Sequence, residues 1–216
     1  EFMFIDTAGL RRKSKVEDKV EKYSVLRSWQ AIERADICLM VIDGTEGVTE
    51  QDTKIAGYAH EQGKGIIVVV NKWDIVEKDD KTMQEFRKSF KKDLIFMTYA
   101  PSVFVSAMTG LRLSNLFELI SFVNEQQCMR IKTGMLNDIL NEATAMVQPP
   151  SDKGKRLKIY YGTQISVKPP TFVIFINDIK LMHFSYERYI ENQIRKVFGF
   201  EGTPIRFIMR EKQKKD

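Results

Sequence analysis

The sequence predicts an α/β domain built on a parallel sheet, followed by a smaller α+β domain. In the first part, short runs rich in β-branched residues alternate with amphipathic stretches, which is the pattern of a parallel sheet covered by helices on both faces. After residue 130 the order becomes helix, strand, strand, helix, strand. A chain of 216 residues is long enough for two modest domains, each with its own core. We therefore expect domains at residues 1–130 and 131–216.

The first domain is predicted to contain four strands with helices between them. The strands are expected at Phe2–Ile5, Ile37–Asp43, Ile66–Asn71 and Val103–Ser106. Apolar residues at near-helical spacing predict helices over residues 20–34, 51–62 and 114–125. Each helix is expected to pack its apolar side against the sheet.

The second domain is predicted to be a sheet covered by two helices. The helices are expected at Gly134–Val147 and Ser185–Phe198, with Ser185 as the N-cap of the second. The strands are expected at Leu157–Gly162, Phe172–Asn177 and Ile205–Arg210, after a polar break at Gln148–Arg156. Pro169 and Pro170 are expected to keep the segment between the first two strands extended.

Cysteine usage and hydropathy exclude several classes of protein. Cys38 and Cys128 lie far apart and form no C-x-x-C, so the sequence supports neither a disulfide framework nor a zinc site. No apolar run approaches the roughly 20 residues of a membrane helix, and the first residues do not form a signal peptide. We expect a soluble, cytoplasmic protein.

Positive charge is concentrated in the second domain. Residues 131–216 carry 15 Lys and Arg against nine Asp and Glu, a net charge of +6, whereas residues 1–130 carry 19 against 20. Such a field favours nucleic acid, although a basic surface that only aids solubility is the alternative. The best candidates for phosphate contacts flank the polar break and the first strand: Lys153, Lys155, Arg156, Lys158 and Lys168.

The first candidate motif is D-x-x-G, at the end of the strand predicted for Phe2–Ile5. Asp6 follows that strand directly, and Gly9 lies three residues further on. A carboxylate at a strand's carboxyl end can hold Mg²⁺ through water, and a glycine lets a backbone N–H approach a γ-phosphate. Alone, the motif is explained equally well by a structural turn.

The second motif, N-K-x-D, spans Asn71–Asp74 and follows another apolar strand. The carboxylate of Asp74 can accept hydrogen bonds from guanine N1–H and N2–H₂, a donor pair that adenine lacks. Asn71 and the aliphatic stem of Lys72 are expected to brace the loop and cover the base plane. A polar helix cap is the weaker explanation, because nucleotide sites lie at the carboxyl ends of parallel strands.

The third motif follows the predicted strand Val103–Ser106 and reads S-A-x-T-G from Ser106 to Gly110. The small side chain of Ala107 permits its backbone N–H to reach guanine O6, and Ser106 can brace this loop. The order and spacing of the three motifs together indicate a guanine-nucleotide site.

The sequence contains no G-x-x-x-x-G-K-[ST], so nothing in it cradles the α- and β-phosphates. In a fold of this kind, the strand that precedes the phosphate loop lies between the strands predicted at residues 2–5 and 37–43. We therefore expect a gap in the sheet at this position, and a chain that is an excerpt of a longer polypeptide.

Several segments together resemble one family. They are DTAGLRRK at 6–13, EKYS at 21–24, NKWD at 71–74, VKPP at 167–170, HFSYER at 183–188 and FGFEGTPI at 198–205. These segments resemble the Der (EngA) family of bacterial GTPases, and the resemblance covers essentially the whole chain.

The resemblance implies a Ras-like P-loop GTPase domain, incomplete because the phosphate-loop strand is lacking, followed by a KH-like domain of order α-β-β-α-β. The chain would correspond to the second of two tandem G domains from its G3 box onward. Asp6 is the implied magnesium ligand. The positions implied to contact nucleotide are Asp6, Thr7, Ala8, Gly9, Leu10, Asn71, Lys72, Trp73, Asp74, Ser106, Ala107 and Met108.

The same resemblance implies a GTP-binding and GTP-hydrolysing factor that acts in assembly of the large ribosomal subunit. Its cofactors would be GTP or GDP and Mg²⁺, with a monovalent cation as a further candidate. Its partners would be the large ribosomal subunit, rRNA and the upstream G domain of the same polypeptide, without a membrane. The alternative is a non-catalytic docking module for protein and rRNA, with GTP turnover residing in another G domain.

Two positions differ from the motifs of Ras-like GTPases and of RNA-binding KH domains. Leu10 stands where Ras-like enzymes place a glutamine, and it cannot orient a water molecule. Gly199-Phe200-Glu201-Gly202 has the spacing of an RNA-binding KH loop, but it lies between a helix and a strand, so a helix C-cap is the better explanation.

Overall fold

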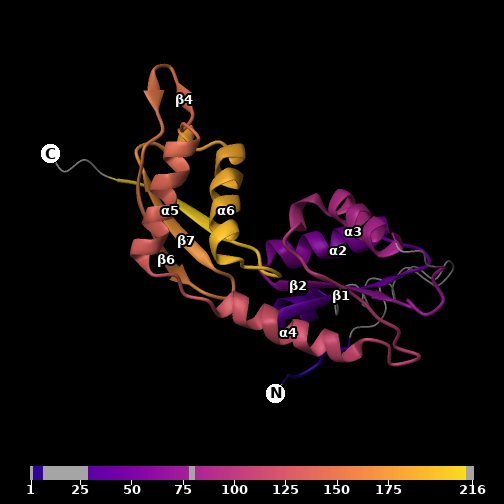
Figure 1. Ribbon diagram of the computed structural model, residues 1–216. Helices are drawn as coiled ribbons and strands as arrows, with labels where there is room; N and C mark the ends of the chain where they lie inside the picture. The colour runs from indigo at the N-terminus through magenta and orange to yellow at the C-terminus, as the bar shows by residue number, and fades with distance from the viewer. Residues whose placement is uncertain (1, 7–28, 78–80, 213–216) are drawn as a thin grey trace. The chain divides into compact units, whose positions relative to one another are not determined.

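The computed structural model describes residues 2–6, 29–77 and 81–212 (Figure 1). The chain divides into two compact units, Glu1–Asn124 and Glu125–Asp216. The boundary predicted between residues 130 and 131 lies shortly after the observed division.

The first unit is built on three parallel strands in the order β1-β2-β3. These are β1 (Ile37–Asp43), β2 (Gly65–Asn71) and β3 (Ser102–Phe104). The helices are α2 (Glu50–Glu61), α3 (Thr82–Asp93) and α4 (Leu113–Cys128), with a 3-10 turn, η1, at Ile95–Met97; residues 29–34 are also helical. The three later strand predictions and the helices at 51–62 and 114–125 agree with these bounds to within three residues. The α3 helix was not predicted.

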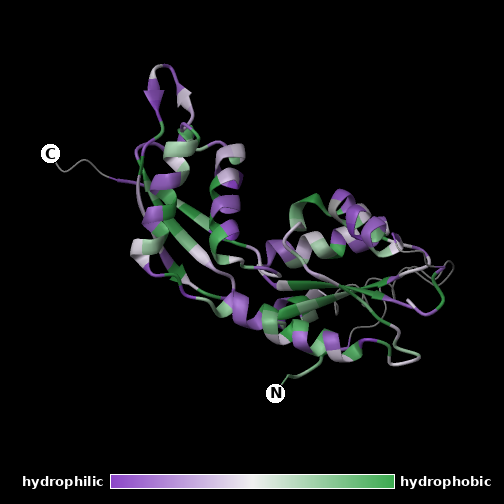
Figure 2. Ribbon diagram, in the orientation of Figure 1, coloured by the Kyte–Doolittle hydropathy of each residue, from purple (hydrophilic) through white to green (hydrophobic). Residues whose placement is uncertain are grey.

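Side chains of the strands alternate between two apolar layers. Met40, Ile42, Ile66, Val68 and Val70 pack with Ala56 and Ala59 of α2 and Phe90 of α3. Ile67, Val69, Val103 and Val105 pack on the opposite face with Ile120 and Val123 of α4. Because β2 is covered on both faces, all of its residues except Asn71 are buried, and β1 and β2 are predominantly hydrophobic (Figure 2).

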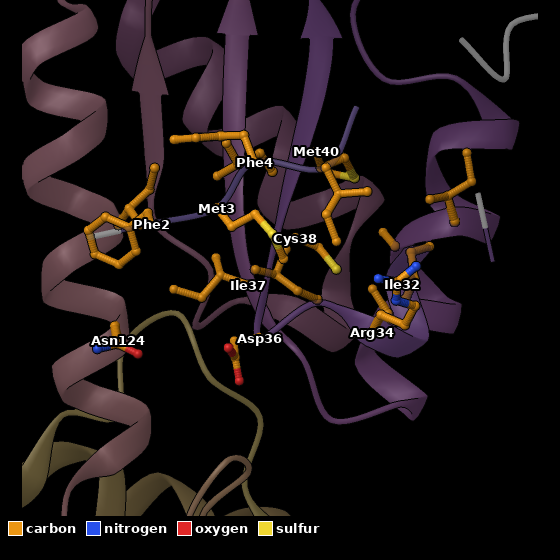
Figure 3. A pocket seen from close by; sticks show the side chains of 17 residues that line it. Phe2, Met3, Phe4, Ile32, Arg34, Asp36, Ile37, Cys38, Met40 and Asn124 are labelled. Atoms are coloured by element: carbon orange, nitrogen blue, oxygen red, sulfur yellow. The ribbon is translucent and has the colours of Figure 1, made fainter. Parts of the chain in front are cut away.

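The strand predicted at Phe2–Ile5 is not present. These residues are described, but they form no strand: β1 pairs with β2, and no described strand pairs with residues 2–5. A cavity of about 370 Å³ is lined by Phe2–Ile5 and by Ile37–Met40 of β1, as Figure 3 shows. Its position coincides with the gap that the sequence predicts next to residues 37–43.

The second unit packs two helices on one face of a three-stranded sheet (Figure 1). The sheet order is β6-β7-β8, with β6 (Ile159–Ser166) antiparallel and β8 (Arg206–Glu211) parallel to the central β7 (Thr171–Ile176). The helices are α5 (Thr133–Met146) and α6 (Phe184–Phe198), and η2 is a short turn at Ile179–Leu181. The predicted order of two helices and three strands is confirmed, although the strand bounds shift by up to four residues.

A small β-hairpin precedes this sheet and was not predicted. Its strands are β4 (Ser151–Asp152) and β5 (Lys155–Arg156), within the segment expected to be a break. Lys153 and Gly154 both have positive φ, at 47° and 80°. Such a pair is typical of the two-residue turn that matches the twist of a hairpin.

Two local predictions in this unit need correction. Helix α6 begins at Phe184 with His183 as its N-cap, so the predicted cap, Ser185, lies inside the first turn. The segment around Pro169 and Pro170 is a turn, with Lys168 at a φ of 54°, and not an extended connection.

The structure supports the C-cap explanation for the segment Gly199–Gly202. Gly199 ends α6 with a φ of 87°, and its N–H donates to Arg195 O. The side chain of Phe200 is fully buried in the core, and the guanidinium of Arg195 donates to the carbonyls of Phe200 and Thr203. Within residues 2–6, 29–77 and 81–212, no helix has the length and apolarity needed to span a membrane.

Candidate functional site

The loops that follow β1, β2 and β3 emerge at the same edge of the parallel sheet. Asp43 ends β1, Asn71 ends β2, and Ser106 lies two residues after β3. Carboxyl ends of parallel strands share one edge, so polar residues distant in sequence are brought together there. The second and third predicted motifs therefore lie next to each other at this edge.

Backbone and side-chain hydrogen bonds connect the two predicted base-recognition loops. Asn71 Oδ1 accepts from the N–H of Ala107 at 3.0 Å, and the N–H of Trp73 donates to Val105 O at 3.0 Å. The buried Ser106 accepts from the N–H of Thr109 through its hydroxyl. Bracing by Asn71 and Ser106 was expected. The Ala107 N–H, however, is donated to Asn71 in this structure, whereas the sequence suggested that it would face guanine O6.

The lysine of N-K-x-D is held by an ion pair with β1. Lys72 Nζ lies 2.6 Å from Asp43 Oδ2, and the Asp43 side chain is only 5% exposed. Asp43 Oδ1 also accepts from the N–H and the hydroxyl of Thr45. The Lys72 ammonium, together with these Thr45 hydrogen bonds, holds the pKa of the Asp43 carboxyl well below its usual range. Asp43 is thus an anion at neutral pH.

Lys72 itself has a φ of 59°, an uncommon conformation for a residue with a side chain. Such backbone persists when surrounding contacts impose it. Here the neighbouring Asn71 carbonyl accepts from Gly44 N–H, the next residue's N–H is bonded to Val105, and the ammonium is tied to Asp43. The loop is therefore fixed from both adjoining strands.

Asp74 differs from these bracing residues because it is exposed. Within the part of the chain that the structure describes, its carboxylate has no hydrogen-bond or ion-pair partner. Met108, in the adjoining loop, is 90% exposed. This arrangement leaves an acceptor pair and an apolar side chain available at the edge of the sheet.

Trp73 contributes to the site from its backbone alone. Its side chain is 2% exposed and packs against Phe104 and Phe86, with ring centroids 4.5 and 5.3 Å apart. The indole therefore anchors the loop in the core between the sheet and α3, which leaves only the main chain of Trp73 in the predicted contact region.

The first motif is only partly described. Asp6 is exposed in the structure, while Thr7, Ala8, Gly9 and Leu10 lie outside the described residues. Their roles therefore stay predictions from the sequence.

Sequence reasoning missed Asp43 and Gly44. A β-carbon on Gly44 would lie 2.9 Å from Asn71 O and 3.0 Å from a Val76 methyl, so this position needs a residue without a side chain. The available signal was an Asp-Gly pair at the end of a predicted parallel strand, the same kind of position that drew attention to Asp6.

Each of the two units corresponds to a known protein family. Residues 22–126 match the family described as elongation factor Tu GTP binding domain, and residues 130–210 match the KH-domain-like C-terminal region of EngA bacterial GTPase enzymes. GTPase Der of Acetivibrio thermocellus is 68% identical over 213 residues, which are 99% of this chain and 48% of that protein. This chain belongs to the Der family.

Other members of the Der family match over the same length. GTPase Der of Ruminiclostridium cellulolyticum is 64% identical over 215 residues, all of this chain and 49% of that relative. The chain thus spans about half the length of these relatives. A crystal structure of Aquifex aeolicus Era bound to GDP and AlF4⁻ has 18% identity and a TM-score of 0.47, covering 95% of this chain and 74% of that one. The two family matches, at residues 22–126 and 130–210, confirm the Ras-like and KH-like fold classes predicted from the sequence.

Proposed function

We propose that the first unit binds the guanine base of GTP and GDP, and that the full-length protein hydrolyses GTP while acting in assembly of the large ribosomal subunit in the cytoplasm. The observation that carries this proposal is the exposed Asp74 carboxylate on a loop that is already fixed by its neighbours.

Guanine recognition follows from the hydrogen-bonding capacity of Asp74. Its two carboxylate oxygens would accept from guanine N1–H and N2–H₂, whereas adenine offers no matching donor pair. The methylene stem of Lys72 and the exposed side chain of Met108 would lie against the two faces of the base. Because Asp43 and Asn71 hold the loop beforehand, little ordering cost would accompany binding.

Asp6 fits the magnesium ion that accompanies the nucleotide. Mg²⁺ in phosphate sites is commonly bound by one or two carboxylates, several waters and the phosphates themselves. A single exposed carboxylate at Asp6 meets this need, and the described residues contain no denser cluster of metal-binding side chains. When bound, the ion would neutralise charge on the phosphate oxygens.

The phosphates themselves require residues that this sequence does not contain. Without G-x-x-x-x-G-K-[ST], residues 1–216 have no backbone cradle and no phosphate-binding lysine. We propose that the phosphate loop of the full-length protein supplies them, and that Leu10 leaves hydrolysis to positioning and charge, with a monovalent cation as a candidate aid.

We propose that the second unit docks on rRNA or on the G domains, and that nucleotide state sets the relation between the units. The support is the net charge of +6 on residues 131–216 and the exposed basic side chains of the β4–β5 hairpin. Lys155 is the least available of these, since it lies 2.8 Å from Asp178 Oδ2.

A docking module without turnover is the second candidate function. The net charge of +6 on residues 131–216 supports it, because attraction of a polyanionic partner does not require GTP turnover. In that case GTP turnover would reside in another G domain, and the Asp74 loop would have no part in it.

Asp74→Ala in the full-length protein distinguishes the two functions. If this site turns over GTP, the variant should lose that share of phosphate release, and its association with large ribosomal subunits should respond less to replacing GDP by a non-hydrolysable GTP analogue. Glu77→Ala, an exposed acid close by in the same segment, is the matched control and should behave as the parent does. Unchanged turnover and unchanged nucleotide response in Asp74→Ala would favour the docking module.

A further inference from the structure

The sheet of the second unit has one face that neither α5 nor α6 covers. Phe172, Ile174 and Ile176 of β7 belong to the core formed with α5 and α6. Side chains alternate along a strand, so the neighbouring residues of β7 point to the opposite face. The strand register places nine residues on this open face: Tyr161, Thr163, Ser166, Thr171, Val173, Phe175, Arg206, Ile208 and Arg210. The exposed Ile165 lies next to them, at the irregularity of β6 between Gln164 and Ser166.

The open face is aromatic, apolar and basic, and it contains no acidic residue. Tyr161, Ile165 and Ile208 are each 40% exposed or more, and both arginines are exposed. Thr171 and Val173 on the central strand are buried, so the accessible part of this face is made by Tyr161, Ile165, Ile208 and the two arginines. Monomeric proteins rarely expose contiguous apolar patches that have no binding role. The absence of Asp and Glu from this set makes an anionic partner the favoured one.

Two of these residues form a fixed aromatic pair. The rings of Tyr161 and Phe175 stack with centroids 4.3 Å apart and an interplanar angle of 17°. β6 is the outer strand of this sheet, so the far side of the Tyr161 ring faces the sheet edge. Arg210 lies beside Phe175 in the register of β7 and β8, on the other side of the pair.

We infer that this open face binds single-stranded RNA, with a base stacked on Tyr161 and the backbone phosphates held by Arg210. Sheets that display aromatic rings bind unstacked bases in this way, and arginines beside them contact the phosphates. The inference rests on the proposed docking on rRNA and names a surface for it that is distinct from the β4–β5 hairpin. Double-stranded RNA offers no exposed base faces and is a poorer match.

The test uses the full-length protein and a fluorescein-labelled 12-nucleotide oligouridine, with a 12-base-pair RNA duplex for comparison. The parent should bind the single strand more tightly than the duplex. The double variant Tyr161→Leu, Phe175→Leu keeps apolar volume but removes both rings, and it should bind oligouridine roughly tenfold more weakly or worse, the range expected for a lost base stack. Arg210→Gln should also weaken binding and reduce its salt dependence.

Phe184→Leu is the matched control, because Phe184 is an 80% exposed aromatic residue on α6, in the helical layer of the same unit. It should bind oligouridine as the parent does. Parental affinity in the double variant, or no binding of oligouridine by the parent, would overturn the inference. The inference would also be overturned if the double variant still bound oligouridine but no longer associated with large subunits. In that case the open face would contact protein and not RNA.

The experiment also distinguishes failure of this inference from failure of the proposed role in assembly of the large ribosomal subunit. A full-length protein that binds oligouridine through this face, yet does not associate with large ribosomal subunits in any nucleotide state, would support the RNA surface and contradict the ribosomal role.

Discussion

At the scale of single residues, the pair formed by Asp43 and Lys72 organises the candidate site. A nearly buried carboxylate satisfies three donors, two from Thr45 and one from Lys72, and thereby connects the end of β1 to the loop after β2. Removing one member of such a set leaves the others without their partner, which costs more than the net value of the bonds themselves.

Asp43→Ala should therefore lower the free energy of unfolding by about 1–3 kcal/mol at pH 7, measured by urea denaturation. Because the pKa of Asp43 is depressed in the folded protein, its contribution is fully present above the unfolded value of about 3.9 and declines as the pH falls below that value. The difference between parent and variant should stay constant from pH 8 to 5 and narrow below about pH 4.

Glu50→Ala provides the comparison for Asp43→Ala. Glu50 is paired with Lys54 on α2, but its side chain is 85% exposed, so its loss should change stability by no more than about 0.5 kcal/mol. If the difference in the free energy of unfolding between the parent and Asp43→Ala widened as the pH fell, the ionised carboxylate would not be stabilised in the folded state.

At the scale of elements, the sequence predicted the strands that are buried on both faces and the helices with regular apolar spacing. β1 and β2 are long runs of β-branched and apolar residues, and such runs have few alternatives in a folded chain. The capping box of α2, with Thr49 and Asp52 bonding each other's backbone N–H, is likewise a local signal.

Elements that depend on tertiary context were missed or misplaced. Helix α3 has no side-chain cap, and the residues that pack on the core, Met83, Phe86 and Phe90, are few among charged neighbours, so the helix was not predicted from the sequence. The hairpin β4–β5 has only two residues in each strand, too few for any periodicity. Phe2–Ile5 has a strand-like sequence, but strand formation also requires a neighbour with free backbone groups. The Asp43–Lys72 pair joins residues distant in sequence, which one sequence alone does not reveal.

The side chain of Gln164, on β6, holds the backbone that leads into helix α5. It is buried on β6, where its carboxamide accepts from Ile131 N–H at 2.7 Å and donates to Met129 O and Ser166 O. Gln164→Leu should lower the free energy of unfolding by about 2–4 kcal/mol, because it leaves buried backbone groups unpaired. Denaturant titration measures this change. Thr163→Val, the neighbouring position on the open face, should alter stability by under about 1 kcal/mol, and an equal loss in both variants would assign no special role to Gln164.

The β4–β5 hairpin should contribute phosphate contacts to ribosome binding. Reversing Lys153, Arg156 and Lys158 to Glu should weaken association with large subunits and flatten its salt dependence, by about 0.7–0.9 in the log–log slope for each lost contact. Lys155 is left unchanged because its reversal would repel Asp178. Circular dichroism should remain parental, since all three side chains are exposed.

Reversal of Arg34, Lys88 and Lys92, on the helix at residues 29–34 and on α3, makes the same change in net charge elsewhere. If this control weakens association as much as the hairpin variant does, only overall charge matters. If neither variant has an effect, the hairpin serves solubility.

At the scale of the whole molecule, the two units combine a sheet edge suited to a purine base with a small basic domain. In the proposed function, the loops at Asn71–Asp74 and Ser106–Gly110 would recognise the base, whereas this sequence has no G-x-x-x-x-G-K-[ST] motif to hold the phosphates. Base specificity is therefore the property that this chain should determine by itself.

The most direct test is a calorimetric titration of the full-length protein and its Asp74→Asn variant with GDP and with xanthosine diphosphate. The variant places an amide N–H₂ where guanine N1–H and N2–H₂ need acceptors, so GDP binding at this site should weaken by about 2–4 kcal/mol. Xanthine carries a carbonyl in place of the exocyclic amine, so the variant should bind xanthosine diphosphate more tightly than the parent does. Unchanged GDP affinity at every site of the Asp74→Asn protein would contradict the assignment of this loop as a guanine site.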